Sequence, residues 1–288
     1  MKIAILTDSN AGIDINEAKE LGVYLAYTPI IIEEETFYQE DGLTKEKFYA
    51  ELKSDKNITT SMPSPGDIMD RWDKLLDEGY EQIVYIPLSS GLSNSCHAAI
   101  QLSEEYDGKV QVVDNHRISV TMRQAVLDAI WMADNGKDAK EIKEALEANA
   151  FDSIIYLTVD DLKYLKKGGR VTPAAAALGA VLNIKPVLRT VGENFDAVDK
   201  VRGSKRAISK MLDYTEEYVN KLLENNDTSK IRIGTFEKEE DCNSWLEQVK
   251  ERFPNIPDIY YDPLSLVVGV HTGPEAAGIG VSLILREE

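Results

Sequence analysis

The sequence has few cysteines and histidines, the residues that bind zinc or, for cysteine, form disulfides. Only two cysteines, Cys96 and Cys242, and three histidines occur among 288 residues. The cysteines lie far apart and outside any CxxC or Cys/His spacing, so the sequence predicts neither a disulfide framework nor a zinc site. We therefore expect no bound metal.

Motifs for nucleotide binding are also missing. The sequence contains no Walker A motif, no kinase glycine-rich loop and no GxGxxG fingerprint. These motifs supply the backbone amides that hold the phosphates of ATP or of a dinucleotide. We expect no cofactor, and any phosphate chemistry is expected to belong to another protein.

Long apolar runs are absent as well. The uncharged stretch of small and aliphatic residues from Val171 to Ile184 has 14 residues, whereas a membrane-spanning helix needs about 20. The apolar run at the start meets Asp8, which makes it too short for a signal-peptide core. We expect a cytoplasmic protein without a membrane span, and a transient contact with a membrane is compatible with this.

Positive charge is scarce overall but concentrated in one place. The formal net charge is -18, which argues against binding to nucleic acid. Residues 163–206, here called the basic segment, nevertheless hold ten Lys or Arg against three acids. Clusters of charged residues of this kind usually form solvent-exposed surface without a binding role. The adjacent glycines and small residues favour a binding or docking role.

Strand-like and helix-like stretches alternate along the N-terminal half. This pattern predicts a mostly parallel sheet with helices on both faces and a ligand at the carboxyl ends of the strands. The expected strands are 2–8, 23–32, 82–89 and 110–114, and the expected helices are 45–53, 65–78, 94–106, 119–135 and 137–149.

A second series of elements follows, so we expect an α/β fold of two domains, 1–150 and 151–288, with a mixed C-terminal sheet. No linker rich in proline or glycine marks the break near Ala150. The expected strands are 153–159, 186–191, 195–201, 231–236, 258–264, 267–273 and 280–285, and the expected helices are 173–182, 205–224 and 239–252.

Hydroxyl side chains gather in the turns 59–67, 87–95 and 271–278. In the first turn, Ser64 before Pro65 is explained by helix capping, which leaves Thr60 and Ser61. In the second turn, hydroxyls and free backbone amides gather at a helix N-terminus, which predicts a pocket for an anion or carboxylate. Ser90 and Ser93 are candidates for this pocket, whereas capping explains Ser95 equally well.

One alternative from these residues is a serine hydrolase. Ser93 occupies the nucleophile position of a sequence close to the G-x-S-x-G elbow, and His271 follows it in hydrolase order. Against this, position 95 is not glycine, and no acid is evidently placed to orient His271. We read His271 as lying at the end of an apolar strand, where it either donates to a carboxylate or satisfies backbone carbonyls.

The other two histidines give weaker signals. His97 is next to Cys96 on an expected helix, where neighbouring side chains diverge by about 100°, so a catalytic pair is not expected. His116 follows Asp114 in a polar loop and is compatible with an ordinary surface residue. No role follows for Asp8, Asp114 or His116.

The run from Val171 to Ile184 is built of small and aliphatic residues. Thr172 and Pro173 are expected to open a helix whose surface permits either close helix packing or close approach of an apolar ligand. A hydroxyl-lined end beside an aliphatic wall describes a site for an amphiphile. Burial at about 0.8 kcal/mol per methylene lets a long acyl chain supply most of the affinity.

Seven segments in this order resemble the DegV family, the fatty-acid-binding subunits of bacterial fatty acid kinase: TDSNAGI, TSMPSPGD, SSGLSNS, VVDN, LKYLKKGGRVTPAAAALGAVLNIKPVL, KVRGSKRA and VGVHTGPEAAGIG. The resemblance implies a fatty acid between two α/β domains, its carboxylate held by Ser61 and Ser93 with His271 close by. Arg170 and Arg202 match positions near the acyl head group or the kinase contact.

The resemblance implies a carrier without catalysis of its own. It would bind a long-chain fatty acid, present the carboxylate to a separate ATP-dependent fatty acid kinase and retain the acyl phosphate. A small-molecule sensor is a further alternative. The expected ligand-binding residues are Ser61, Ser90, Ser93, Asn94, Arg170 and His271, and the expected kinase-binding residues are Lys200, Arg202 and Lys205.

Two segments depart from the usual family pattern. VVDNHRIS replaces a commoner Asp-Ser form, and GLSNSCHA places Asn94 and Cys96 where smaller or aromatic residues are frequent. The head-group hydroxyls survive these changes, so the departures bear on acyl-chain preference.

Overall fold

A four-stranded parallel sheet organises the N-terminal half of the computed structural model, which describes residues 2–39, 42–54, 56–178, 184–237 and 242–286. The strand order is β2-β1-β6-β7, and all neighbouring pairs are parallel. This confirms the predicted sheet. The strands are β1 (Ile3–Asp8), β2 (Val23–Ala26), β6 (Gln82–Ile86) and β7 (Val110–Val112).

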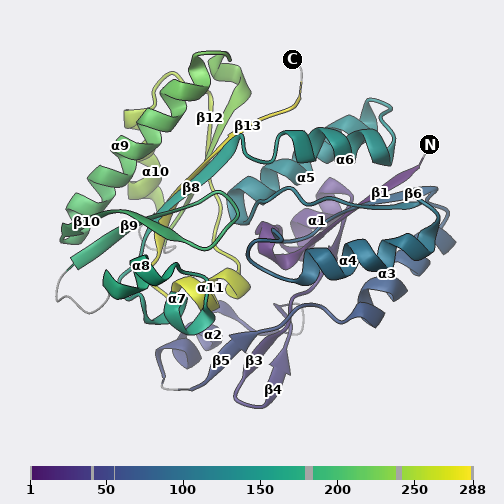
Figure 1. Cartoon of the computed structure of the whole chain (residues 1–288), viewed down its shortest axis with the longest axis horizontal. Helices are drawn as coiled ribbons and strands as arrows, with labels where there is room; N and C mark the ends of the chain where they lie inside the picture. Colours follow the sequence, from purple (N-terminus) through teal and green to yellow (C-terminus); the bar gives the residue numbers. More distant parts are fainter. Residues whose placement is uncertain (1, 40–41, 55, 179–183, 238–241, 287–288) are drawn as a thin grey trace.

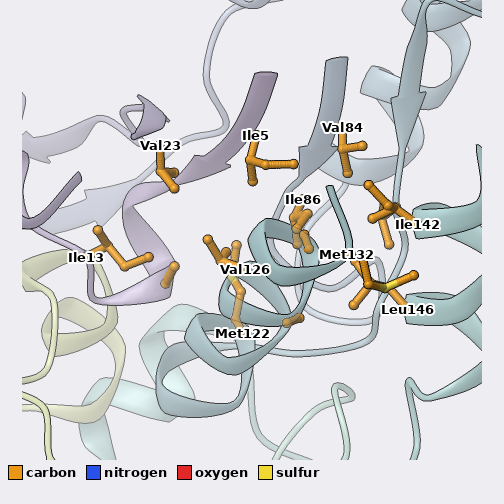
Figure 2. Packing of buried hydrophobic residues seen from close by; sticks show 14 of the residues in the cluster. Ile5, Ile13, Val23, Val84, Ile86, Met122, Val126, Met132, Ile142 and Leu146 are labelled. Atoms are coloured by element: carbon orange, nitrogen blue, oxygen red, sulfur yellow. The ribbon is translucent and has the colours of Figure 1, made fainter. Parts of the chain in front are cut away.

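Helices cover both faces of this sheet, as predicted. On one face, Met122 and Val126 of α5 and Ile142 of α6 pack against Ile5 and Val84 (Figure 2). On the other face, Trp72 and Cys96 belong to the cluster that contains Leu6 and Tyr85. The helices of this half are α1 (Ile15–Leu21), α2 (Lys45–Lys53), α3 (Pro65–Asp77), α4 (Ser95–Ser103), α5 (Ser119–Asp134) and α6 (Ala139–Ala148).

The single strand expected at 23–32 is wrong, because the segment contains two strands in different sheets. β2 ends at Ala26, and β3 (Ile30–Ile32) joins β4 (Glu35–Phe37) and β5 (Ile58–Thr60) in a small antiparallel sheet. The break has a local cause, since Pro29 carries no backbone N–H. The N–H of Thr28 donates instead to Ser9 Oγ at 3.1 Å.

The C-terminal half forms a six-stranded mixed sheet, as predicted, in the order β10-β9-β8-β13-β11-β12. β11 and β12 are parallel, and the other neighbours are antiparallel. One face of this sheet is covered by α9 (Ser204–Leu223) and α10 (Cys242–Arg252) (Figure 1). The strands are β8 (Ser153–Thr158), β9 (Ile184–Thr190), β10 (Asp196–Arg202), β11 (Ile231–Phe236), β12 (Asp258–Tyr261) and β13 (Ala277–Leu283).

The other face of the C-terminal sheet contributes to an apolar cluster that also includes residues of the N-terminal half. We call this set the shared apolar cluster. It takes side chains from residues 87–93, here called the serine-rich turn, from the start of α5, from the strands β8, β9 and β11, and from α7 (Lys163–Gly168) and α8 (Pro173–Ala177). Its members include Leu92, Ile118, Val120, Ile155, Leu157, Leu165, Val171, Ala175, Leu188, Phe195, Phe236, Leu264, Val268 and Ala276.

The strand expected at 267–273 is wrong, because these residues form the helix α11 (Leu266–Thr272). The valine-rich sequence suggested a strand. Ser265 caps the helix by accepting from the N–H of Val268 at 3.4 Å. A Cβ at Gly269 would lie 3.2 Å from the ring of Phe48 in α2, so the helix packs closely against its neighbour there.

Two predicted helices reach into residues that are not described. α8 covers Pro173–Ala177 of the helix expected at 173–182, and residues 179–182 lie outside the described residues. Residues 239–241 of the helix expected at 239–252 lie outside them as well. The predicted N-cap is confirmed, since Thr172 Oγ1 accepts from the N–H of Ala175 at 3.2 Å. Among the described helices, none has the length and apolar character to cross a membrane.

Candidate ligand-binding site

A cavity of about 70 Å³ lies where the N-terminal sheet, α7 and α11 meet. We call it the head-group cavity. Its polar lining includes Thr60, Ser93, Arg170 and His271, and its apolar lining includes Ile118, Phe195 and Val268 of the shared apolar cluster. The cavity therefore joins a polar end to the apolar layer between the sheets, at the edge where ligands of parallel sheets are expected.

The serine-rich turn after β6, residues 87–93, is tightly held by its own backbone amides. The N–H of Leu88 donates to Asp8 Oδ2 at 2.8 Å, and the N–H of Ser90 donates to Asp114 Oδ1 at 3.2 Å. Asp8, at the end of β1, and Asp114, just after β7, thus anchor this turn from the two strands that flank β6, although the sequence assigned them no role. Burial raises the pKa of Asp8, and the hydrogen bonds that Asp8 accepts from Leu88 and Asn10 oppose the shift.

The other backbone amides of residues 88–93 also donate hydrogen bonds to groups of the protein. The N–H of Ser89 donates to the carbonyl of Arg117, and that of Gly91 donates to Ser89 Oγ, both at 3.2 Å. The amides of Leu92 and Ser93 both donate to the carbonyl of Ser89 at 3.1 Å. The expectation of free backbone amides is therefore wrong for residues 88–93 of this turn.

Ser93 is left as the donor of the serine-rich turn. Its Oγ accepts from the N–H of Ser95 at 3.2 Å, and it lines the head-group cavity. Because a hydroxyl has one hydrogen and two lone pairs, this arrangement leaves the O–H to be donated to a ligand. In the part of the chain that the structure describes, no charged side chain is hydrogen-bonded to Ser93.

His271 stands opposite, in the last turn of α11. Its Nε2 lies 2.8 Å from Thr60 Oγ1, and its Nδ1 is buried without a hydrogen-bond partner among the described residues. Burial, and secondarily the charge of Arg170, lowers the pKa of His271 to about 4. The imidazole is therefore neutral at neutral pH, with one ring nitrogen still to be satisfied.

Arg170 links the two sides of the cavity. Its Nε donates to the carbonyl of Leu92 at 3.1 Å, and its Nη1 donates to the carbonyl of Gly168. Gly168 has to be glycine, since a Cβ at this position would overlap Nδ1 of His271. Arg170 and Gly168 together bring the end of α7 against both the serine-rich turn and the imidazole.

The predicted ligand-binding residues are only partly brought together. Ser61, Ser93, Arg170 and His271 line the head-group cavity, and Ser61 is exposed at its edge. Ser90 and Asn94 lie beside the cavity without lining it, and Asn94 is exposed at the start of α4. Their roles in binding stay predictions.

Sequence reasoning missed the importance of Thr60. It lies in the same turn as Ser61, and it is the hydroxyl that contacts His271. The sequence left Thr60 unexplained by capping, but nothing in the pattern distinguished it from Ser61. The contact joins residues 211 positions apart, which only the fold reveals.

The predicted kinase-binding residues Lys200, Arg202 and Lys205 are all exposed. Lys200 and Arg202 lie on the edge strand β10, and Lys205 lies in the first turn of α9. Phe195, just before β10, lines the head-group cavity. The exposed cations and the cavity are thus joined by one strand.

His116 belongs to a contact between the two halves. Its Nε2 lies 3.5 Å from Asp114 Oδ2, and its ring packs against Phe151 with centroids 4.8 Å apart. The carbonyl of Gly192, in the turn between β9 and β10, accepts from Ser89 Oγ. The turn of this hairpin therefore rests on the serine-rich turn.

The hydrolase alternative lacks support in this geometry. A catalytic histidine is normally oriented by an acid at its second ring nitrogen. Nδ1 of His271 faces Gly168 and has no carboxylate within hydrogen-bonding distance in the described part of the chain. Ser93 and His271 line one cavity, but the third group of a triad is not in place.

The fold and site define a class of α/β proteins with two sheets and a cavity at the carboxyl ends of a parallel sheet. A family model described as an uncharacterised protein of the DegV family matches residues 2–283. The chain belongs to the DegV family, which confirms the resemblance seen in its motifs. It is 31% identical, over 291 aligned positions, to a DegV domain-containing protein of Clostridium acetobutylicum, with 100% of this chain and 99% of the relative covered.

Solved structures show the same fold. The structure of DegV from Bacillus subtilis, described as a fatty acid binding protein, superposes with a TM-score of 0.84 at 27% identity, covering 98% of this chain and 99% of that one. A DegV family protein from Thermus thermophilus, whose structure is described by its fatty acid binding, has a TM-score of 0.88 at 24% identity, with 99% of this chain and 100% of that chain covered. At that identity the second likeness concerns the fold alone.

Proposed function

We propose that this protein binds a long-chain fatty acid, with the carboxylate in the head-group cavity and the acyl chain along the shared apolar cluster. The main support for the proposal is that the polar and apolar parts of the site adjoin each other. A hydroxyl donor, a neutral imidazole and an apolar layer meet within one cavity. The description of the Bacillus subtilis relative as a fatty acid binding protein supports the same ligand.

The polar end is suited to a carboxylate that must remain reactive. Ser93 offers a neutral donor, and His271 is neutral because burial lowers its pKa to about 4. Arg170 already donates to two backbone carbonyls, so its charge is partly engaged. Neutral donors orient a carboxylate without the strong stabilisation of a dedicated ion pair, which would oppose its use as a nucleophile.

The apolar end supplies the affinity. Each buried methylene contributes about 0.8 kcal/mol, so a long acyl chain needs little help from the head group. The sequence predicted that the acyl chain lies against residues 171–184. Val171 and Ala175 of this stretch belong to the shared apolar cluster. Residues 179–183 of that stretch lie outside the described residues.

We further propose that the protein has no catalysis of its own and presents the carboxylate to a separate ATP-dependent kinase, retaining the acyl phosphate. The exposed cations Lys200, Arg202 and Lys205 support this role, because such groups steer an acidic partner surface. β10 connects them to Phe195 at the cavity. The proposed place of action is the cytoplasm, where ATP is available to the kinase.

Native mass spectrometry before and after organic extraction tests the binding. We expect purified protein to retain a mass that matches a free fatty acid, and an empty protein in several preparations contradicts the proposal. Ser93→Ala and His271→Gln are expected to reduce the retained fraction. His97→Gln, which changes an exposed histidine on α4, is the matched control and is expected to bind normally.

The hydrolase alternative has its own test. Turnover of a p-nitrophenyl ester by the wild type that disappears in Ser93→Ala overturns the carrier proposal. We expect no turnover above that of the Ser93→Ala variant.

A further inference from the structure

The turn between β9 and β10, residues 190–195, is fixed by the side chain of Thr190. We call it the hairpin turn. Thr190 Oγ1 donates to the carbonyl of Glu193 at 2.6 Å and accepts from the N–H of Gly192 at 2.9 Å. Thr190 is buried, although Val191 and Glu193 of the same turn are exposed. A hydroxyl that bonds two backbone groups in this way defines the conformation of the turn.

The hairpin turn contacts the serine-rich turn of the N-terminal half. Ser89, which is buried, donates through its Oγ to the carbonyl of Gly192. The two turns also approach each other closely at the next residue, because a Cβ at Gly91 would lie 2.5 Å from the carboxyl group of Glu193. Thr190 therefore holds the two residues of the hairpin turn that lie against the serine-rich turn.

The last residue of the hairpin turn contacts a second wall of the head-group cavity. The N–H of Phe195 donates to the carbonyl of Arg170 at 2.8 Å, and the carbonyl of Phe195 accepts from the N–H of Thr172 at 2.9 Å. The side chain of Phe195 is buried and lines the head-group cavity. The hairpin turn thus ends on the segment that follows α7 and carries Arg170.

These contacts close into a ring of hydrogen bonds beside the head-group cavity. From the hairpin turn the ring passes through Phe195 to Arg170, whose Nε donates to the carbonyl of Leu92 at 3.1 Å. The N–H of Leu92 donates to the carbonyl of Ser89 at 3.1 Å, and the hydroxyl of Ser89 leads back to the hairpin turn. The ring joins residues of both halves. Ser93 follows Leu92 directly, so the ring sets the place of its hydroxyl relative to Arg170.

We propose that Thr190 is a positioning residue for the carboxylate of the bound fatty acid. Because its hydroxyl is engaged with the backbone of the hairpin turn, Thr190 acts through the ring, which keeps the Ser93 hydroxyl where the carboxylate requires it. A site that is ordered before binding loses less conformational entropy when the ligand arrives. This inference rests on the proposed binding of a fatty acid, and it adds that a hydroxyl bonded to the hairpin turn contributes to the affinity.

Two substitutions at Thr190 test this role. Thr190→Val keeps the shape of the side chain and removes both hydrogen bonds of the hydroxyl, whereas Thr190→Ser keeps the hydroxyl. Isothermal titration calorimetry of delipidated protein with stearic acid measures the affinity. We expect Thr190→Val to weaken binding by about tenfold, as for the loss of about one hydrogen bond, and Thr190→Ser to bind within about twofold of the wild type. Wild-type affinity in Thr190→Val overturns the proposal.

The Ser93→Ala background distinguishes positioning from a purely structural role. If the ring acts by placing the Ser93 hydroxyl, removing that hydroxyl also removes most of the effect of Thr190, because residues that act as a unit are not additive. We therefore expect Thr190→Val to weaken binding by less than about twofold in the Ser93→Ala background. An undiminished loss in that background means that Thr190 only supports the fold, which contradicts the proposal.

Thr215→Val is the matched control. It removes another buried threonine hydroxyl, which donates to the carbonyl of Met211 within α9 at 2.8 Å. We expect Thr215→Val to bind stearic acid like the wild type. An equal loss of affinity in Thr215→Val and Thr190→Val attributes the effect to general destabilisation and overturns the proposal.

A second variant decides the question if Thr190→Val does not fold. Ser89→Ala opens the ring at its contact with Gly192, and its effect on affinity is again compared with and without the Ser93 hydroxyl. We expect the same dependence on Ser93, and equal losses in both backgrounds contradict the proposal. A wild type that binds no stearic acid contradicts the proposed function as well, whereas normal binding by the wild type and by Thr190→Val contradicts the role of Thr190 alone.

Discussion

The two sides of the head-group cavity are built differently. On one side, the serine-rich turn has the amides of residues 88–93 bound within the protein, two of them to the carboxylates of Asp8 and Asp114. On the other side, the imidazole of His271 has one hydrogen bond, to Thr60, and a buried Nδ1 without a partner in the described part of the chain.

This difference gives the two sides of the cavity different roles in ligand binding. The serine-rich turn is already ordered by its hydrogen bonds. Ser93 therefore presents its hydroxyl to a ligand without a further loss of conformational entropy in the turn. The imidazole still has a polar group to satisfy, which costs about 1–3 kcal/mol while it is buried and unpaired. We expect the turn to set the position of the carboxylate. The histidine is expected to gain the most free energy from ligand binding, because its unpaired ring nitrogen then obtains a partner.

Removing an anchor of the serine-rich turn is expected to have the largest effect. Asp8→Ala leaves the amides of Leu88 and Asn10 without their buried acceptor, and each unsatisfied group costs about 1–3 kcal/mol. We expect a loss of about 2–6 kcal/mol in the free energy of unfolding, measured by urea denaturation, together with loss of bound fatty acid.

Asp8→Asn is the control for this change, because the amide oxygen still accepts one of these bonds. We expect it to lie between the wild type and Asp8→Ala in both stability and binding. Equal stability of all three proteins would mean that the turn does not depend on its anchor, and that the contrast between the two sides is wrong.

On the histidine side, a change at Gly168 is expected to affect binding far more than stability. In Gly168→Ala the new methyl group overlaps Nδ1 of His271, so the imidazole has to move away from Thr60. We expect fatty acid affinity to fall by about tenfold or more, as for the loss of a hydrogen bond to a charged group. The free energy of unfolding is expected to change by about 1 kcal/mol.

Gly169→Ala is the matched control, with the same added methyl group one residue later. No atom of the described residues lies within 4 Å of a Cβ there, although the left-handed backbone, with φ of 68°, costs some stability. We expect this variant to be slightly less stable than the wild type and to bind normally. Equal binding by both variants contradicts the role given to Gly168.

These outcomes show which parts of the site a sequence can reveal. Ser64 and Thr172 were predicted as helix caps because capping is local and each is followed by proline. The anchoring of Leu88 and Ser90 was not predictable, since Asp8 and Asp114 come from other strands. Backbone amides that look free in a sequence are satisfied by side chains distant in the chain.

The fold class was predictable from the alternation of strands and helices, but α11 was not. Its valines favour a strand locally, whereas Ser265 caps a helix and Gly269 packs against Phe48. Tertiary packing overrides such propensity. The domain boundary near Ala150 stays a prediction.

The pH dependence of stability provides a smaller and more specific test. Burial raises the pKa of Asp262 to about 7, although Arg123 Nη1 lies 3.9 Å away. Between pH 4 and 7 the folded protein therefore keeps a proton on Asp262 that the unfolded chain has lost, so this group's contribution to stability falls as the pH rises. His271, with a pKa of about 4, has the opposite sign, because the unfolded chain binds the proton.

The two groups are expected to offset each other in the wild type. Relative to the wild type, Asp262→Asn should lose about 2 kcal/mol of stability on acidification from pH of about 7 to about 5. His271→Gln should gain a similar amount relative to the wild type over the same change. Urea denaturation at the two pH values measures both, and identical pH profiles for all three proteins contradict the assigned shifts.

Charge reversal in the basic segment is expected to have the smallest effect on the cavity itself. Lys200 and Arg202 are exposed on β10, and surface substitutions of this kind change stability by less than about 0.5 kcal/mol. We expect Lys200→Glu with Arg202→Glu to retain fatty acid like the wild type while slowing phosphorylation by the partner kinase, most strongly at low salt, because screening weakens such steering. Lys221→Glu, an exposed change on α9 outside the basic segment, is the control and should be phosphorylated normally. Unchanged phosphorylation of the double variant removes Lys200 and Arg202 from the proposed contact. Loss of the bound fatty acid instead means that the substitutions on β10 disturb the cavity through Phe195.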